Sequence, residues 1–202
     1  MNKFSRGSGR ATSTCIVSNQ INATDTVQLY YFSQSTGNAS SSFPSDNWTA
    51  YALAVDASNA TGSATSSAVN VNVLTAINVT TSSVAYGLLS PNTDTGATNR
   101  TTTVANAGNS STTLQLSSSQ TLTSGANVIA TSSQVYSTST ITYPGTSTGL
   151  TSSAVTVTAF NLTSPTSTTN VTGNIFWGLS VPSGKPTGTY TGTNVFGALF
   201  IQ

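Results

Sequence analysis

The chain has 202 residues, only 4% of them charged, and a net charge of +1. It contains no His and no Glu, so general acid–base catalysis, catalytic triads and His-based metal sites lose their usual residues. Positive charge gathers only at Lys3, Arg6 and Arg10, whereas nucleic-acid-binding proteins carry larger basic clusters. We therefore predict that the protein is not an enzyme and has no catalytic, cofactor-binding or metal-binding residue and no nucleic-acid partner.

The remaining composition favours strands and turns. Ser and Thr together make up over a third of the chain. Thr, Val, Tyr and Phe are frequent in strands, and Gly, Asn and Ser in turns. An aqueous helix needs charged or other strong helix-forming residues on its polar face, and these are scarce here. We predict an all-β protein without a membrane span, because no apolar run has the length of a transmembrane helix.

Residues 1–12 are expected to form a flexible tail, and residues 13–75 a short β-sandwich domain. Its strand candidates are residues 14–20, 26–32, 48–56 and 63–74, and the polar stretch 33–46 is predicted to be a loop. Four strands are too few to cover both faces of a core and protect its edges. Either a neighbouring subunit supplies a strand, or residues 33–44 contain strands that the pattern does not reveal.

Residues 76–202 are expected to form a second domain, with a boundary near residues 74–76. Turn signals such as Pro91-Asn92 and Pro144-Gly145 separate short strand candidates at regular intervals, which is typical of a β-sandwich. The candidates are residues 77–84, 85–89, 100–106, 112–116, 128–130, 134–142, 154–162, 171–181 and 189–201. This number of strands is enough to close a sandwich.

The two final strands carry the strongest pattern. In the first, Ile175, Trp177, Leu179 and Val181 alternate with more polar or smaller residues. In the second, residues 195–201 are apolar on both faces, so they should be covered on both sides, by their own domain or by a neighbour. Residues 11–21 and 195–201 are therefore the candidate donors of an inter-subunit strand, with the candidate contact residues Thr14, Ile16, Val17, Val195, Phe196, Leu199, Phe200 and Ile201.

Covalent glycans are a second expectation. The acceptor triplet Asn-x-Ser/Thr occurs nine times, at Asn22, Asn38, Asn47, Asn59, Asn78, Asn99, Asn109, Asn161 and Asn170. Because Asn, Ser and Thr are abundant, chance alone accounts for many of these triplets. Sugars on exposed triplets would supply the solubility that surface charge does not provide here. Cys15 is the only cysteine, which excludes an intrachain disulfide and leaves a buried thiol or an interchain link.

Two weaker patterns have ordinary structural interpretations. Asp94-Thr95-Gly96 matches the tripeptide of aspartic proteases, but it lies in a polar turn. Six aromatic residues are candidates for a carbohydrate-binding platform, although such residues more often fill a sandwich core. They are Trp48, Trp177, Tyr30, Tyr31, Tyr51 and Tyr190.

Residues 68–89, 99–110 and 171–198 resemble the Ig-like modules of secreted archaeal or minimal-genome bacterial cell-surface and filament proteins. The matching stretches include Val71-Asn72-Val73-Leu74, Thr101-Thr102-Thr103-Val104 and Ile175-Phe176-Trp177-Gly178. The resemblance implies two Ig-like β-sandwich domains in an extracellular or cell-surface protein. We expect a homopolymer, in which each subunit donates a strand to the next to build a filament; the alternatives are a surface-layer protein and an adhesin or carbohydrate-binding module.

Overall fold

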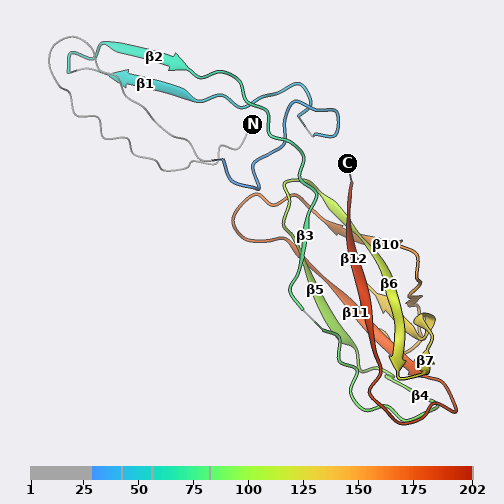
Figure 1. Cartoon of the computed structure of the whole chain (residues 1–202). Coiled ribbons are helices and arrows are strands. Elements are labelled where there is room, and N and C mark those ends of the chain that lie inside the picture. Colours follow the sequence, from blue (N-terminus) through green and yellow to red (C-terminus); the bar gives the residue numbers. More distant parts are fainter. Residues whose placement is uncertain (1–28, 42, 56, 82, 202) are drawn as a thin grey trace. The chain divides into compact units, whose positions relative to one another are not determined.

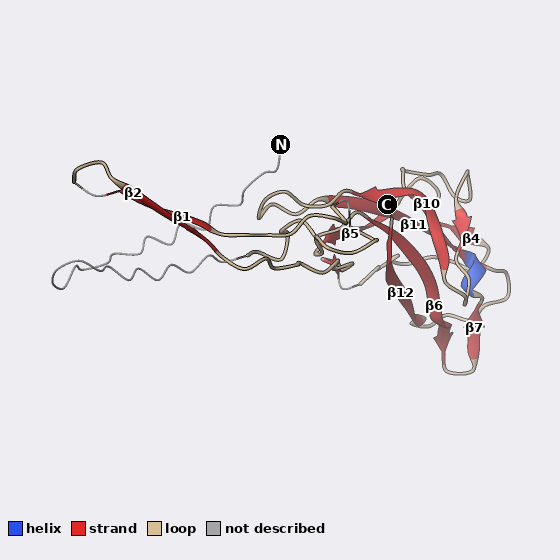
Figure 2. Ribbon diagram, turned by 90° about the horizontal axis from the view of Figure 1, so that it is seen from above, coloured by secondary structure: helices blue, strands red, loops and turns tan. Residues whose placement is uncertain are grey.

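The computed structural model describes residues 29–201 except 42, 56 and 82. The described residues contain no α-helix, and their helical structure is confined to the 3-10 turn Thr131–Ser133 (Figure 2). All the strand pairings are antiparallel, so the prediction of an all-β protein is confirmed. The chain divides into two compact units, residues 1–73 and 74–202.

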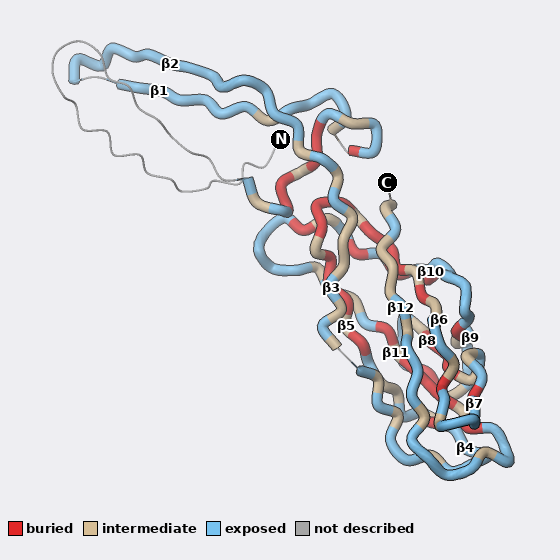
Figure 3. The backbone as a smooth tube through the Cα atoms, in the orientation of Figure 1, coloured by how far each residue is buried: buried red, intermediate tan, exposed pale blue. Residues whose placement is uncertain are grey.

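In the first unit, β1 (Tyr51–Val55) and β2 (Thr61–Thr65) form a two-stranded ribbon. Every residue of this ribbon is exposed, as Figure 3 shows by its pale blue colour. Both strands are shorter than predicted, because the flanking residues pair only locally, through the bond from the Ser66 amide to the Ala50 carbonyl and the isolated bridge between Trp48 and Val69. A two-stranded ribbon without a covered face is marginally stable in water.

The buried residues of the first unit come largely from residues 33–46, the stretch predicted to be a loop. Phe32, Ser33, Ser35, Thr36 and Ser41 are all buried. Hydroxyl groups make this possible, because they satisfy polar groups that burial removes from water. The Ser41 hydroxyl donates to the Ser35 carbonyl, and the Thr36 amide donates to the Val71 carbonyl. Sequence polarity was therefore a poor guide to exposure here.

The second unit contains two antiparallel sheets (Figure 1). The larger sheet has the order β3-β5-β11-β8-β9, and β4 pairs with the end of β11. The bounds are β3 (Ile77–Val79), β4 (Thr93–Asp94), β5 (Arg100–Asn106), β8 (Gln134–Ser137), β9 (Thr148–Gly149) and β11 (Thr172–Val181). The smaller sheet has the order β10-β6-β12, and β7 pairs with β6. Its strands are β6 (Thr112–Ser124), β7 (Asn127–Ile129), β10 (Val155–Leu162) and β12 (Thr191–Phe200).

The two sheets pack on a shared core, a sandwich-like arrangement. Ile175, Trp177, Leu179 and Val181 are buried, so the alternation predicted for this strand is confirmed. Trp177 is 0% exposed and packs against Tyr136 of the larger sheet and Phe196 of the smaller one, each with a ring-centroid distance of 6.0 Å. Side chains of both sheets therefore meet around this indole.

A bulge lets β10 contribute to that core from both of its halves. The pairing of β10 with β6 shifts register between Thr156 and Asn161, and Ala159 has a φ of 60°. Val157 and Phe160 are three positions apart, yet both side chains are buried. A regular strand would point them to opposite faces, so the extra residue of the bulge re-aims the second half of the strand.

Several strand predictions in this unit were wrong in extent or existence, and the expected strands 77–84 and 134–142 shorten to β3 and β8. Residues 85–89 form no strand, although they were expected to do so. β6 runs from Thr112 to Ser124 and is far longer than the predicted 112–116, because the polar run 117–121 continues the pairing with β12. Ser and Thr can extend a strand whose backbone finds a partner, even where no apolar alternation marks it.

Candidate binding groove

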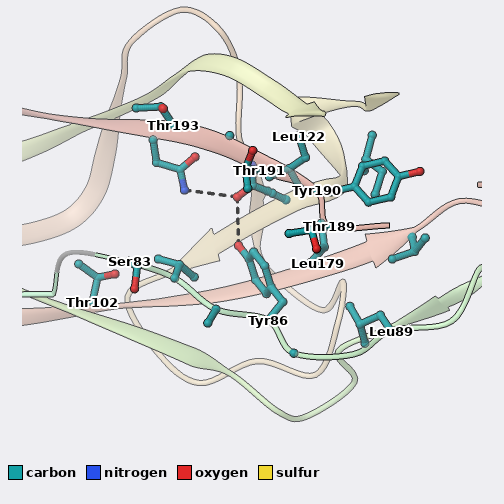
Figure 4. Close-up of a pocket in the computed structure, with 18 of the residues that line it drawn as sticks. Ser83, Tyr86, Leu89, Thr102, Leu122, Leu179, Thr189, Tyr190, Thr191 and Thr193 are labelled. Carbon is teal, nitrogen blue, oxygen red and sulfur yellow. Dashed lines mark hydrogen bonds between the residues drawn. The ribbon is translucent and has the colours of Figure 1, made fainter. Parts of the chain in front are cut away.

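A cavity of about 610 Å³ opens at one side of the second unit, between the two sheets. We call it the edge groove. Residues 188–194 and Phe196 line it from the side of the smaller sheet, and residues 83–89, the rim segment, line the opposite side. Figure 4 shows the side chain of Tyr86 pointing from the rim segment into this space, toward Thr191.

Both sides of the groove have backbone that no neighbouring strand pairs with in the described part of the chain. β12 makes a single ladder there, with β6, so its other edge is open. The rim segment lies between two hydrogen bonds to the larger sheet, from the Thr80 amide to the Thr103 carbonyl and from the Asn92 amide to the Val181 carbonyl. Unpaired backbone of this kind is a template for an added strand.

The floor of the groove consists of two apolar clusters. The first, centred on Trp177 and Tyr136, reaches the groove through Phe196 and Val84, which pack against it. The second contains Leu122, Ile129, Leu179 and Val181, with Leu89 and Tyr190 at its margin. Tyr86 packs against both clusters.

Polar side chains lie beside these clusters, and Gln134 on β8 is opposite Leu179 on β11. Gln134 is only 2% exposed, and its Oε1 accepts hydrogen bonds from the Tyr86 hydroxyl at 3.1 Å and from Asn194 Nδ2 at 3.3 Å. Its Nε2 is buried and has no hydrogen-bond partner. Burial also raises the pKa of Tyr86, because the phenolate would lose its hydration. No charged residue lines the groove, and the unpaired Nε2 of Gln134 is buried beneath its surface.

The candidate donor residues fall into two groups. Thr14, Ile16 and Val17 lie outside the described residues. Val195, Phe196, Leu199 and Phe200 belong to β12 and pair with β6 of their own chain, and the Ile201 amide donates to the Ser111 carbonyl. Val195 and Leu199 are 42% and 41% exposed, so the chain's own domain covers this run incompletely, and its coverage by a neighbour stays a prediction.

The structure separates the acceptor triplets into accessible and inaccessible ones. Asn109 is 5% exposed, and its Oδ1 accepts from the Leu74 amide at 2.7 Å. The Asn99 side chain makes two hydrogen bonds to the backbone of Ile141, at 2.7 and 2.8 Å. A sugar is attached to Nδ2, so it would have to displace the buried Asn109 side chain, and at Asn99 it would compete with the hydrogen bond that Nδ2 donates to the Ile141 carbonyl. Asn38 is half-buried, Asn22 lies outside the described residues, and the exposed acceptors are Asn47, Asn59, Asn78, Asn161 and Asn170.

Residues of the weaker sequence patterns make ordinary turn, core and backbone contacts. Asp94 Oδ1 accepts from the Gly96 amide at 2.7 Å, which closes a turn. Trp177 is buried in the core, and the Trp48 indole donates to the Gln34 carbonyl at 2.9 Å. No group of His, Cys, Asp and Glu among the described residues is arranged to hold a metal ion. In that same part of the chain, no helix has the length and apolar character needed to cross a membrane.

Sequence reasoning did not identify the edge groove. The available signal was Gln134, a polar residue at the inward-facing position two before Tyr136 on β8. The comparisons add no relative: no protein-family model, curated protein or solved structure matches the chain.

Proposed function

We propose that this protein is the structural subunit of an extracellular filament, in which a strand of one subunit fills the edge groove of the next. The observation that carries this proposal is the groove itself: two unpaired backbone edges above an apolar floor. An extended segment placed there gains main-chain hydrogen bonds from the edges and buries alternate side chains in the floor. The proposal also includes the two Ig-like β-sandwich domains that the sequence resemblance implies.

The donor in this proposal is residues 11–21 of a neighbouring copy. The other candidate, residues 195–201, already contributes β12 to its own sheet. Removing β12 would expose the first apolar cluster, in which Phe196 packs against Trp177. That cost favours the amino-terminal segment as the donor.

Donation of this kind produces an open polymer. Donor and acceptor are different parts of the chain, so each contact leaves one free donor and one free groove at the ends. The accessible glycan acceptors fit this arrangement, because none of the five is among the residues that line the groove. Glycans on them would cover the outside of the polymer and leave the joint free.

Electron microscopy of the purified full chain tests the proposal. We expect unbranched fibres one subunit wide, since each copy contacts one neighbour at either end. Two-dimensional sheets would instead identify a surface-layer protein. Monomers that stay dispersed at high protein concentration would contradict a polymer and would favour the adhesin alternative.

A further inference from the structure

The open edge of β12 is a long, regular sheet edge in the second unit. β12 pairs with β6 without a register shift from Asn194 to Phe200, and that stretch contains no proline and no charged residue. The opposite edge of the same sheet is β10, whose pairing is interrupted by the bulge between Thr156 and Asn161. In the larger sheet, β3, β4 and β9 are only two or three residues long. Proteins usually protect exposed edges with bulges, charges, proline or short strands, and β12 has none of these protections.

The backbone of β12 presents alternate residues to this open edge. Just past the end of the strand, the Ile201 amide donates to the Ser111 carbonyl at 3.2 Å. The Leu199 carbonyl likewise accepts from the Thr112 hydroxyl on β6. In an antiparallel ladder the residues that bond a given neighbour alternate along the strand, so the odd-numbered residues here direct their amides and carbonyls toward β6. The even-numbered residues of the range 194–200 therefore direct theirs away from β6.

Those outward backbone groups border the edge groove. Asn194 and Phe196 line it, whereas Val195, whose backbone faces β6, does not. A strand that fills the groove therefore meets amides and carbonyls of β12 that point toward it. It can bond to them as a further strand of the smaller sheet.

The rim segment on the other side of the groove is a poorer edge. Gly87 has a φ of 84°, in the left-handed region that interrupts an extended chain. Val84 and Tyr86 pack on the core two positions apart, but the next residue that packs on it is Leu89, three positions farther. The alternation of a strand is therefore lost at Gly87. The Tyr86 carbonyl is already bonded to Arg100 Nη2, at 3.0 Å.

We propose, resting on the proposed function, that the strand donated by a neighbouring copy pairs with β12 and not with the rim segment. The smaller sheet then has the order β10-β6-β12-donor, and the rim segment contacts the donor only through side chains. No charged residue lines the groove, so an uncharged segment suits it, and a chain with 4% charged residues contains such segments. Two β12 edges that paired with each other would instead give a closed dimer without a free edge.

The test introduces Ala198→Pro into the full chain. Proline removes an amide that faces the open edge, and it is tolerated on edge strands where that amide has no partner within the sheet. We expect the polymerised fraction, measured by sedimentation, to fall by about tenfold or more, because a proline on the edge blocks an added strand. The near-ultraviolet dichroism of the aromatic residues around Trp177 should stay unchanged. Ala85→Pro on the rim segment is the matched control and should change the polymerised fraction by less than about twofold.

Hydrogen exchange decides the same point without a substitution, and so also if Ala198→Pro does not fold. The amides of Phe196 and Ala198 should exchange at least about tenfold more slowly in the polymer than in dispersed subunits, and the Ala85 amide should not. Polymer unaffected by Ala198→Pro, equal loss from both proline variants, or slowed exchange at Ala85 instead of β12 would overturn pairing along β12 while strand donation stands. Wild-type chains that form only closed dimers or monomers would overturn the proposed function itself.

Discussion

Replacing Trp177 by Ala is expected to lower the free energy of unfolding of the second unit by about 3–5 kcal/mol, the usual cost of truncating a buried aromatic side chain. Trp177 is fully buried between the two sheets and packs against Tyr136 and Phe196. Its indole nitrogen also donates to Thr102 Oγ1 at 3.0 Å, and Thr102 is 1% exposed. The substitution therefore leaves a cavity and a buried hydroxyl without its donor. Such a loss is a large fraction of the stability of a typical domain.

The measurement is chemical denaturation followed by far-ultraviolet circular dichroism at one fixed chain concentration, because polymerisation would make stability depend on concentration. Val195→Ala is the matched control. Val195 lies on β12, next to Phe196, but its side chain is 42% exposed on the outer face, so the expected loss is below about 1 kcal/mol. Equal effects of the two substitutions would contradict the assignment of Trp177 to the centre of the core.

Deleting residues 11–21 is expected to abolish filament formation and to leave the second unit folded. The groove would then have no occupant, and the polymer would lose its only proposed joint. Sedimentation and electron microscopy measure the loss of polymer. The dichroism signal of the aromatic residues around Trp177 reports whether the core is intact.

The matched control deletes residues 2–10, which lie upstream of the proposed donor and hold Lys3, Arg6 and Arg10. This chain should still form filaments. Filaments of unchanged length from the chain lacking residues 11–21 would refute donation by this segment. Loss of filaments from both deletions would show that the amino-terminal region acts through something other than the donated strand.

The sequence predicted the strands whose apolar residues alternate. β11 and β12 lie close to their predicted bounds, and β5 matches residues 100–106. Alternation could not reveal the length of β6, whose polar second half is held by backbone pairing with β12. Alternation also predicted a strand at residues 85–89, where the structure has none. Val84 and Tyr86 face the core there, but the segment has no neighbouring strand among the described residues to pair with.

The candidate groove was beyond sequence reasoning for a different reason. Periodicity shows which side chains face inward, but it does not show where two sheets fail to close over their core. Gln134, Tyr86 and Asn194 are far apart in the sequence, and only the pairing of β8 with β11 and the course of β12 bring them together. The expectation that a neighbouring subunit donates a strand nevertheless came from the sequence. That expectation placed the missing strand in residues 13–75. The described structure puts an open edge in the second unit.

Disulfide trapping in assembled filaments tests the proposed joint most directly. Cys15 is the only cysteine and belongs to the proposed donor segment, residues 11–21. Ser83→Cys and Leu89→Cys place a second thiol at either end of the rim segment, and Thr158→Cys places one on the exposed face of β10. After oxidation we expect one of the two rim variants to give a ladder of covalent multimers on a non-reducing gel, and the β10 variant to give none. Filaments in which both rim cysteines stay unlinked would contradict the account.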